Sequence, residues 1–267
     1  MGGCIAGLWC KGVAVLQSTE PTKLRSVRDA ASFVMVPFSN RIGYGQLKWQ
    51  GVQYSIERNF ALEPHAIHGV GWERGWSVVQ QSPEQVTLNL VHQADQNWPF
   101  GFMAEQRFLL EDNTIKMVLT INNTDERIVP VGLGWHPYFV KRKGAKLTFN
   151  STGRWEMGED KLPTVRTAHQ GINQITDALN VDHCFDGWSG SVVLEDEVQC
   201  CTIRSNLNRL VVYTHTGLES IAIEPVSHVN NALQMATDIA KAKALGIQTL
   251  KPGESYECSM QITVEKK

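Results

Sequence analysis

The sequence has no CxxC pair, no cluster of basic residues and no apolar run near the ~20 residues of a membrane span. Its six cysteines have spacings that match no zinc module, so no cysteine-based metal site is expected. The formal net charge of −2 gives no electrostatic reason to expect nucleic acid or a membrane surface as a partner. The short run KRKGAK at 141–146 is interpreted as a solvated turn.

The opening stretch MGGCIAGLWCKGVAVL lacks the basic and long apolar regions of a secretory signal. We interpret it as a first pair of strands. Cysteines without such a signal are expected to stay reduced, so the sequence predicts a cytoplasmic protein.

Helical patterns are scarce: only 27–33 and 229–246 favour helices, and the second ends at a glycine. Elsewhere short segments alternate apolar and polar residues at period two, with Gly, Asn, Asp and Ser-Pro between them. The predicted strands are 12–18, 46–57, 76–82, 85–93, 104–112, 114–124, 146–153, 191–197, 200–206, 209–217, 219–225 and 256–265.

A spacing of roughly 8–12 residues between such strands is typical of antiparallel sandwiches and barrels. The chain has 267 residues, 42% of them hydrophobic, which is ample for a sizeable core. No internal repeat, linker or low-complexity tract interrupts it. The sequence therefore predicts a single all-β domain over residues 1–267.

The motif GWHPYF (134–139) places a histidine directly before a proline in an apolar, aromatic run. The ring of Pro137 forces an extended backbone on His136, so we expect this histidine at a strand end or bend. One interpretation is a hydrogen-bonded core histidine. The other is a proton donor among aromatic faces, against which the apolar C–H faces of a sugar could pack.

The stretch HAIHGVGWERGW (65–76) contains two histidines. A metal pair would need a third ligand that is not evident nearby. His68 directly precedes a glycine, as residues close to a ligand or in a tight turn often do, so His68 is a better site candidate than His65.

Glu224 ends the apolar segment SIAI and is followed by a proline. A glutamate at the mouth of a buried strand is partly desolvated, which raises its pKa toward the range useful for proton transfer. The alternative is an ordinary strand-end glutamate in water.

Two further motifs carry polar groups. In PFSNRIGYGQL (37–47), Asn40 and Arg41 lie between an apolar strand and a turn, and arginine offers five fixed donors for hydroxyls or a carboxylate. In NVDHCFDGW (180–188), Asp182 stands among aromatic residues. The alternatives are a surface ion pair for the first motif and a simple turn for the second.

The motifs PFSNRIGYGQ, AIHG, LGWHPYF, VDHCF and IAIEP, in that order, resemble those of the aldose 1-epimerases (galactose mutarotase-like proteins). The resemblance extends from about residue 37 to 233. It implies a large antiparallel β-sandwich, often called a supersandwich. It also implies interconversion of the α and β anomers of a free aldose without a metal or organic cofactor.

By this resemblance, Glu224 corresponds to the general base, His136 to the general acid and His68 to the second histidine of the active site. Arg41 and Asp182 correspond to residues that hold sugar hydroxyls. The complete set of substrate-binding candidates is Arg41, Asn40, Asp182, Trp135 and Tyr138. The expected partner is a small sugar, most simply an aldohexose, and the protein is expected to be a monomer or a homodimer.

Two features differ from the larger galactose mutarotases. Those proteins have LHGG where this chain has IHGVGW. They also have Asn-Leu after the HPYF motif, where this chain has Val140. A hexose-6-phosphate mutarotase is an alternative, for which Arg74 and Arg107 would supply extra positive charge. Two further alternatives are a glycoside hydrolase that uses Glu224 with Asp182, and a non-catalytic carbohydrate-binding protein.

Overall fold

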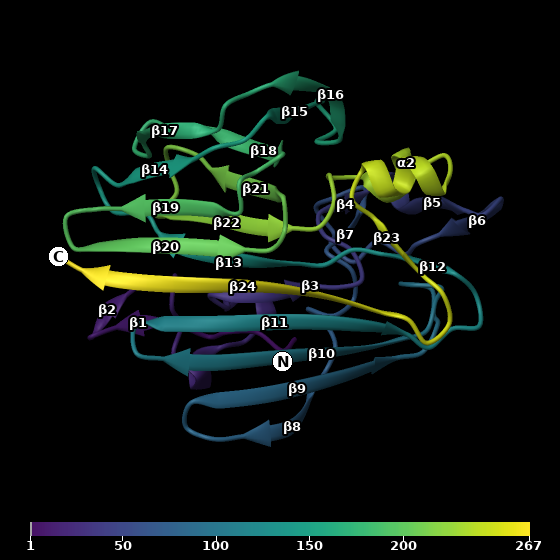
Figure 1. The fold of residues 1–267 in the computed structure, drawn as a ribbon, viewed down its shortest axis with the longest axis horizontal. Coiled ribbons are helices and arrows are strands. Elements are labelled where there is room, and N and C mark those ends of the chain that lie inside the picture. Colours follow the sequence, from purple (N-terminus) through teal and green to yellow (C-terminus); the bar gives the residue numbers. More distant parts are fainter. Residues whose placement is uncertain (1) are drawn as a thin grey trace.

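Two large antiparallel sheets form a sandwich in the computed structural model, which describes residues 2–267 (Figure 1). One sheet has nine strands in the order β17-β14-β19-β20-β24-β11-β10-β9-β8. Their bounds are β8 (Ser77–Gln81), β9 (Gln85–His92), β10 (Phe102–Glu111), β11 (Thr114–Asn123), β14 (Lys146–Phe149), β17 (Ile172–Ile175), β19 (Ser191–Glu195), β20 (Gln199–Ser205) and β24 (Ser255–Lys266).

The other sheet has seven strands in the order β16-β15-β18-β21-β22-β13-β3. Their bounds are β3 (Ser32–Met35), β13 (Gly134–Val140), β15 (Gly153–Met157), β16 (Pro163–Ala168), β18 (Val181–Asp186), β21 (Arg209–Thr214) and β22 (Ser220–Val226).

Shorter elements connect and flank the two sheets. The small strand pairs are β1 (Trp9–Cys10) with β2 (Val13–Ala14), β4 (Arg41–Ile42) with β7 (Ala66–Ile67), β5 (Gln46–Trp49) with β6 (Val52–Ser55), and β12 (Val129–Val131) with β23 (Gln248–Leu250). The α-helices are α1 (Ala232–Met235) and α2 (Ile239–Ala244), and the 3₁₀ helices are η1 (Pro21–Lys23), η2 (Val27–Asp29) and η3 (Gly43–Gly45). None of the helices between residues 2 and 267 is long and apolar enough to cross a membrane.

The nine-stranded sheet buries one face, as the period-two pattern of its strands predicts. Along β11, buried and half-buried residues alternate without interruption. β11 pairs with β24, the long yellow strand in Figure 1, over most of its length. The inward side chains of this pair, such as Leu119 and Met260, belong to the main core between the sheets.

The strands β21, β22, β13 and β3 of the seven-stranded sheet are largely buried on both faces, and this feature positions the site. Trp135, Phe139 and Ile223 face the main core between the sheets. On the opposite face a second apolar cluster gathers around Phe33 and Val211. Side chains from connecting segments cover this second face, namely Val27, Phe60, Ile67 and Trp72. A sheet covered on both sides favours continuous apolar runs, as β22 shows by burying six of its seven residues.

The structure confirms the predicted all-β sandwich and the strand pair near the amino terminus. The prediction of one strand over 46–57 is wrong in detail, because this segment forms the hairpin β5–β6. Gln50 and Gly51 both adopt positive φ angles of 48° and 83°, which suits a tight hairpin turn.

Two other local predictions need correction. The helix expected at 27–33 is only the short η2, because Ser32 already pairs with β13 in the sheet and tertiary pairing overrides a weak propensity. The region 229–246 forms two short helices rather than one. The segment 180–188, for which a turn was an alternative, contains strand β18.

Candidate functional site

His136 and Glu224 are direct neighbours on the outer face of the seven-stranded sheet. β13 and β22 are adjacent antiparallel strands, and Tyr138 lies opposite Ala222. Two residues further along, His136 Nε2 lies 3.1 Å from Glu224 Oε1. The expectation that His136 lies at a strand end is therefore wrong, because it is inside β13 and a cross-strand partner fixes its direction.

Both side chains are buried and only partly satisfied. Glu224 is 2% exposed and His136 is 7% exposed. Within the described part of the chain, His136 Nδ1 and Glu224 Oε2 have no hydrogen-bond partner. Buried polar atoms nearly always have a hydrogen-bond partner, so two adjacent ionisable side chains that each have an unpaired atom indicate a place where a ligand supplies the missing hydrogen bonds.

Burial pushes both groups toward their neutral forms. It raises the pKa of Glu224 well above its ordinary value, with a smaller upward contribution from Asp182 and a downward one from Arg41. Burial also lowers the pKa of His136 to about 3. A neutral glutamic acid beside a neutral imidazole means that the pair carries one mobile proton over a wide pH range.

His68 reaches the same place from a loop. Its backbone N–H donates to the carbonyl of Asn40 (2.8 Å), and the N–H of Asn40 donates to His68 Nδ1 (3.2 Å). Both residues have left-handed backbone conformations, with φ of 57° and 54°. Such conformations cost energy in residues with side chains and tend to cluster at functional sites. The His68 and His136 rings meet edge to face, with their centroids 5.2 Å apart.

The contact to Asn40 also favours one tautomer of His68, because the other close neighbour of Nδ1, Met35 Sδ at 3.0 Å, is only a weak acceptor. Because Nδ1 accepts a backbone hydrogen bond, the proton of the neutral ring lies on Nε2, which can donate to a ligand. Burial lowers the pKa of His68 well below its usual value, and the positive charges of Arg41 and Arg28 and the neighbouring His136 act in the same direction. His68 is therefore arranged as a neutral hydrogen-bond donor.

Arg41 is held by two carboxylate oxygens. Its Nε donates to Glu63 Oε2 (3.2 Å) and its Nη2 to Glu63 Oε1 (3.1 Å). Its Nη1 donates to the side-chain oxygen of Asn40 (3.3 Å). Since Arg41 influences the pKa of both Glu224 and His68, its charge belongs electrostatically to this site.

A second row of residues, three of them with polar side chains, lies beside the pair. Asp182, Tyr213, Ala222 and Tyr138 stand opposite one another across β18, β21, β22 and β13. The ring of Tyr138 lies 4.5 Å from that of His136, centroid to centroid. Burial, and then the nearby Glu224, raise the pKa of the Tyr138 phenol, which keeps it protonated as a hydrogen-bond donor. Asp182 is half-buried, and its charge acts on Glu224.

Trp135 does not join the site, contrary to its prediction as a substrate-binding residue. Successive side chains of a strand point to opposite faces. Because His136 faces the site, Trp135 points into the core between the sheets, where it is 1% exposed.

His65 is held structurally, although it is only three residues from His68. One ring nitrogen accepts from the N–H of Tyr44 (3.0 Å), and the other lies 2.8 Å from the carbonyl of Asp160. Residues 2–267 hold no group of three or more His, Cys, Asp or Glu side chains arranged to hold a metal ion.

Two arginines considered for phosphate binding are engaged elsewhere. Arg74 donates to Asp95 (2.7 Å) and Asn97, and Arg107 on β10 pairs with Glu257 (3.0 Å) in the nine-stranded sheet. Neither contacts His136 or the other site residues.

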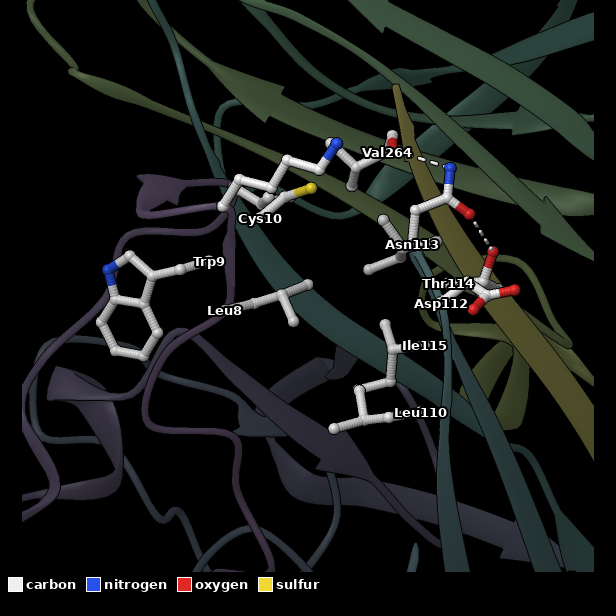
Figure 2. A pocket seen from close by; sticks show the side chains of 12 residues that line it. Leu8, Trp9, Cys10, Leu110, Asp112, Asn113, Thr114, Ile115 and Val264 are labelled. Atoms are coloured by element: carbon white, nitrogen blue, oxygen red, sulfur yellow. Dashed lines mark hydrogen bonds between the residues drawn. The ribbon is translucent and has the colours of Figure 1, made fainter. Parts of the chain in front are cut away.

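A groove of about 550 Å³ lies away from the His136–Glu224 pair (Figure 2). Trp9 lines one side of it, and Asn113 in the β10–β11 turn and Thr114 at the start of β11 line the other. Asn113 donates to the carbonyl of Val264 (2.9 Å), so its amide is used for packing the strands together.

The sequence alone does not identify several residues that surround the pair. Across the sheet, Trp155, Cys184 and Val211 lie in one row with Glu224, and Phe33 follows His136. Phe33 stacks on the His136 ring, with the centroids 4.8 Å apart. These neighbours come from strands far apart in sequence, and only the sheet register brings them together.

Comparison with known proteins agrees with this arrangement. The family described as Aldose 1-epimerase matches residues 1–263. The chain therefore belongs to the aldose 1-epimerase family.

Similar individual proteins span nearly all of the chain. The uncharacterized protein YphB of Escherichia coli (strain K12) is 24% identical over 286 residues, covering 99% of this chain and 93% of YphB. The crystal structure of a putative aldose 1-epimerase from Escherichia coli K12 superposes with a TM-score of 0.89 at 24% identity, covering 100% of this chain and 94% of the other. That of a galactose mutarotase-like protein from Clostridium acetobutylicum gives 0.86 at 18% identity, covering 100% and 90%. These likenesses establish the galactose mutarotase-like fold.

Proposed function

We propose that this protein interconverts the α and β anomers of a free aldohexose, with Glu224 as general base and His136 as general acid. The observation that carries the proposal is the 3.1 Å contact between His136 Nε2 and Glu224 Oε1 in a buried, one-proton pair. Membership of the aldose 1-epimerase family supports the same reaction class.

The reaction needs one proton removed and one added at oxygens that share a carbon. The C1 hydroxyl and the ring oxygen of a pyranose are both bonded to C1, so an adjacent base and acid can reach both. Transfer of the shared proton from Glu224 to His136 forms a carboxylate and an imidazolium. Glu224 then takes the proton of the C1 hydroxyl while His136 gives its proton to the ring oxygen, the C1–O bond of the ring breaks, and C1 becomes an aldehyde.

Ring opening leaves the pair in its neutral form, which burial favours. The aldehyde then rotates about the C1–C2 bond. Reclosure on the other face of C1 reverses both proton transfers and restores the charged pair. The proton then returns from His136 to Glu224, so the enzyme is unchanged after each turnover. His68 Nε2 would donate a hydrogen bond to the reacting oxygens, and Arg41, Asn40, Asp182 and Tyr138 would hold the other hydroxyls.

Polarimetry on freshly dissolved sugars tests this proposal. The protein should accelerate the drift of α-glucose or α-galactose to anomeric equilibrium above the spontaneous rate, and acceleration for α-arabinose alone would identify an aldopentose as the substrate instead. Acceleration only for glucose 6-phosphate would identify a mutarotase for phosphorylated hexoses instead. Release of reducing sugar from a glycoside would indicate a hydrolase, and sugar binding without any acceleration would indicate a non-catalytic module.

A further inference from the structure

Arg41 uses three of its five N–H groups within the protein. Nε and one hydrogen of Nη2 are bonded to Glu63, and one hydrogen of Nη1 is bonded to Asn40. One N–H therefore remains on each terminal nitrogen. Two neighbouring donors in a fixed plane match two neighbouring oxygen acceptors.

Glu63 is anchored from a second direction. Lys161 Nζ donates to Glu63 Oε1 (3.0 Å), the same oxygen that accepts from Arg41 Nη2. Glu63 is 7% exposed. Burial alone would raise its pKa, but the hydrogen bonds from Arg41 and Lys161 outweigh burial and lower the pKa to about 2. Glu63 therefore remains a carboxylate in the range where the enzyme would work.

Lys161 belongs to a turn that docks on the Arg41 region. The turn connects β15 to β16 and is closed by the N–H of Gly158 on the carbonyl of Leu162 (2.8 Å). Its Asp160 carbonyl lies 2.8 Å from His65 Nε2. Two adjacent residues of the turn thus contact the segment that carries Glu63, which restricts where Glu63 can place the guanidinium.

We propose that Glu63, anchored by Lys161, is a positioning residue that aims the two free N–H groups of Arg41 at a pair of adjacent hydroxyls on the sugar. This inference rests on the proposed function and adds a substrate requirement to it. The enzyme needs an aldose with an intact vicinal diol at the Arg41 end of the site, and Glu63 enforces this requirement without touching the sugar.

A purely structural role for Glu63 would have different consequences. If Glu63 only stabilised the fold, its loss would lower the midpoint of unfolding and leave the KM of the folded fraction unchanged. If it aims Arg41, its loss raises KM and weakens discrimination between complete and deoxygenated sugars, even when the variant is fully folded.

The experiment compares the parent, Glu63→Gln, Glu63→Asp and Lys161→Met on the aldose that the parent converts fastest and on its monodeoxy analogues. Hydrogen bonds to a charged group typically contribute enough for a ten- to hundredfold effect, so we expect KM of Glu63→Gln to rise about tenfold or more, with a smaller change in kcat. Glu63→Asp keeps the charge and should recover part of the loss. Lys161→Met, which removes an exposed partner, should raise KM about two- to fivefold.

The analogues supply the more specific readout. Two of the monodeoxy sugars, each lacking a different one of two adjacent hydroxyls, should have a lower kcat/KM than the complete sugar with the parent. Glu63→Gln should lose most of that difference. Glu105→Gln and Lys116→Met are matched controls, because both remove one member of an exposed ion pair on the nine-stranded sheet, and both should behave like the parent.

A KM in Glu63→Gln equal to that of the parent, or unchanged discrimination against the deoxy sugars, would overturn the inference. If Glu63→Gln does not fold, Lys161→Met decides in the same way, through its KM and its discrimination. A parent that fails to accelerate anomerisation rejects the proposed function itself, whereas an active parent with an unaffected Glu63→Gln rejects only the role of Glu63.

Discussion

At the scale of single residues, the candidate site contains a carboxyl group and an imidazole, those of Glu224 and His136, that lie 3.1 Å apart and share one proton. The sequence identifies both, because IAIEP and HPYF are informative motifs and Glu224 follows a buried strand. It does not show that the two side chains touch, since that depends on how β13 and β22 are aligned. Glu63 and Lys161, 98 residues apart, could not be paired with Arg41 from sequence because only the folded chain brings them together.

The pH dependence of the rate follows from the shifted pKa of His136. Burial lowers this pKa to about 3, so the pair keeps its single mobile proton far below the ordinary histidine value of ~6.5. We expect the rate above the spontaneous one to stay level through that value and to fall only near pH 3, or where the protein unfolds. Polarimetry with circular dichroism at each pH checks this. An acidic limb centred near the ordinary value, in folded protein, would contradict it.

The contribution of Glu224 to stability should change with pH in the opposite direction to that of most carboxylates. Its folded-state pKa is raised, so its contribution to stability is complete below the unfolded value of 4.5 and is lost as the pH rises through the folded value. Glu224→Gln cannot ionise. We expect its free energy of unfolding in urea to equal or exceed that of the parent at neutral pH, with the difference disappearing in acid. A large destabilisation at neutral pH would show that Glu224 is a well-satisfied carboxylate.

At the scale of elements, two loops meet to place His68 and Arg41. Residue 36 forms a parallel bridge with Gly69, and the N–H groups of Val70 and Gly71 donate to the carbonyl of Val36. The sequence suggests a close backbone approach here through its glycines, but does not reveal which segment approaches. In the structure the segment is the one that leads into Asn40.

Gly69 is required for this approach. Its φ is 70°, and a Cβ atom would lie 2.2 Å from the carbonyl oxygen of Val36. Gly69→Ala should cost more than the ~1–2 kcal/mol of backbone strain alone, and it should also displace His68 and lower kcat/KM. Gly51→Ala is the control, because Gly51 also has a positive φ but nothing lies near its added Cβ. Urea unfolding and polarimetry should show loss of activity only in the first variant, and full activity in Gly69→Ala would contradict the account.

At the scale of the whole molecule, the two faces of the seven-stranded sheet have different roles, one in packing and one in carrying the candidate site. One face packs against the nine-stranded sheet, and the other carries the His136–Glu224 pair. The period-two pattern predicts an antiparallel sandwich, but a strand buried on both sides does not show in its sequence which residues face which layer. The prediction for Trp135 was wrong for this reason, whereas Tyr138, of the same parity as His136, lies in the site.

Trp135 should therefore matter for stability and not for sugar binding. Trp135→Ala removes a large side chain from the core between the sheets and should lower the free energy of unfolding by about 3–5 kcal/mol, with KM unchanged in the folded protein. Trp9→Ala, at a tryptophan that is 45% exposed, should cost much less. Chemical unfolding and steady-state polarimetry check both. A raised KM with normal stability in Trp135→Ala would place Trp135 in the site after all.

The most direct measurement is the first-order rate constant for anomerisation of fresh α-glucose, or of whichever aldose the parent converts fastest, with the parent and with Glu224→Gln. The amide keeps the shape of the side chain but cannot accept the C1 proton, so the enzymatic rate should fall by about 10²–10⁴-fold while the protein stays folded. A folded Glu224→Gln that equilibrates the sugar as fast as the parent would show that the proton is taken by another group.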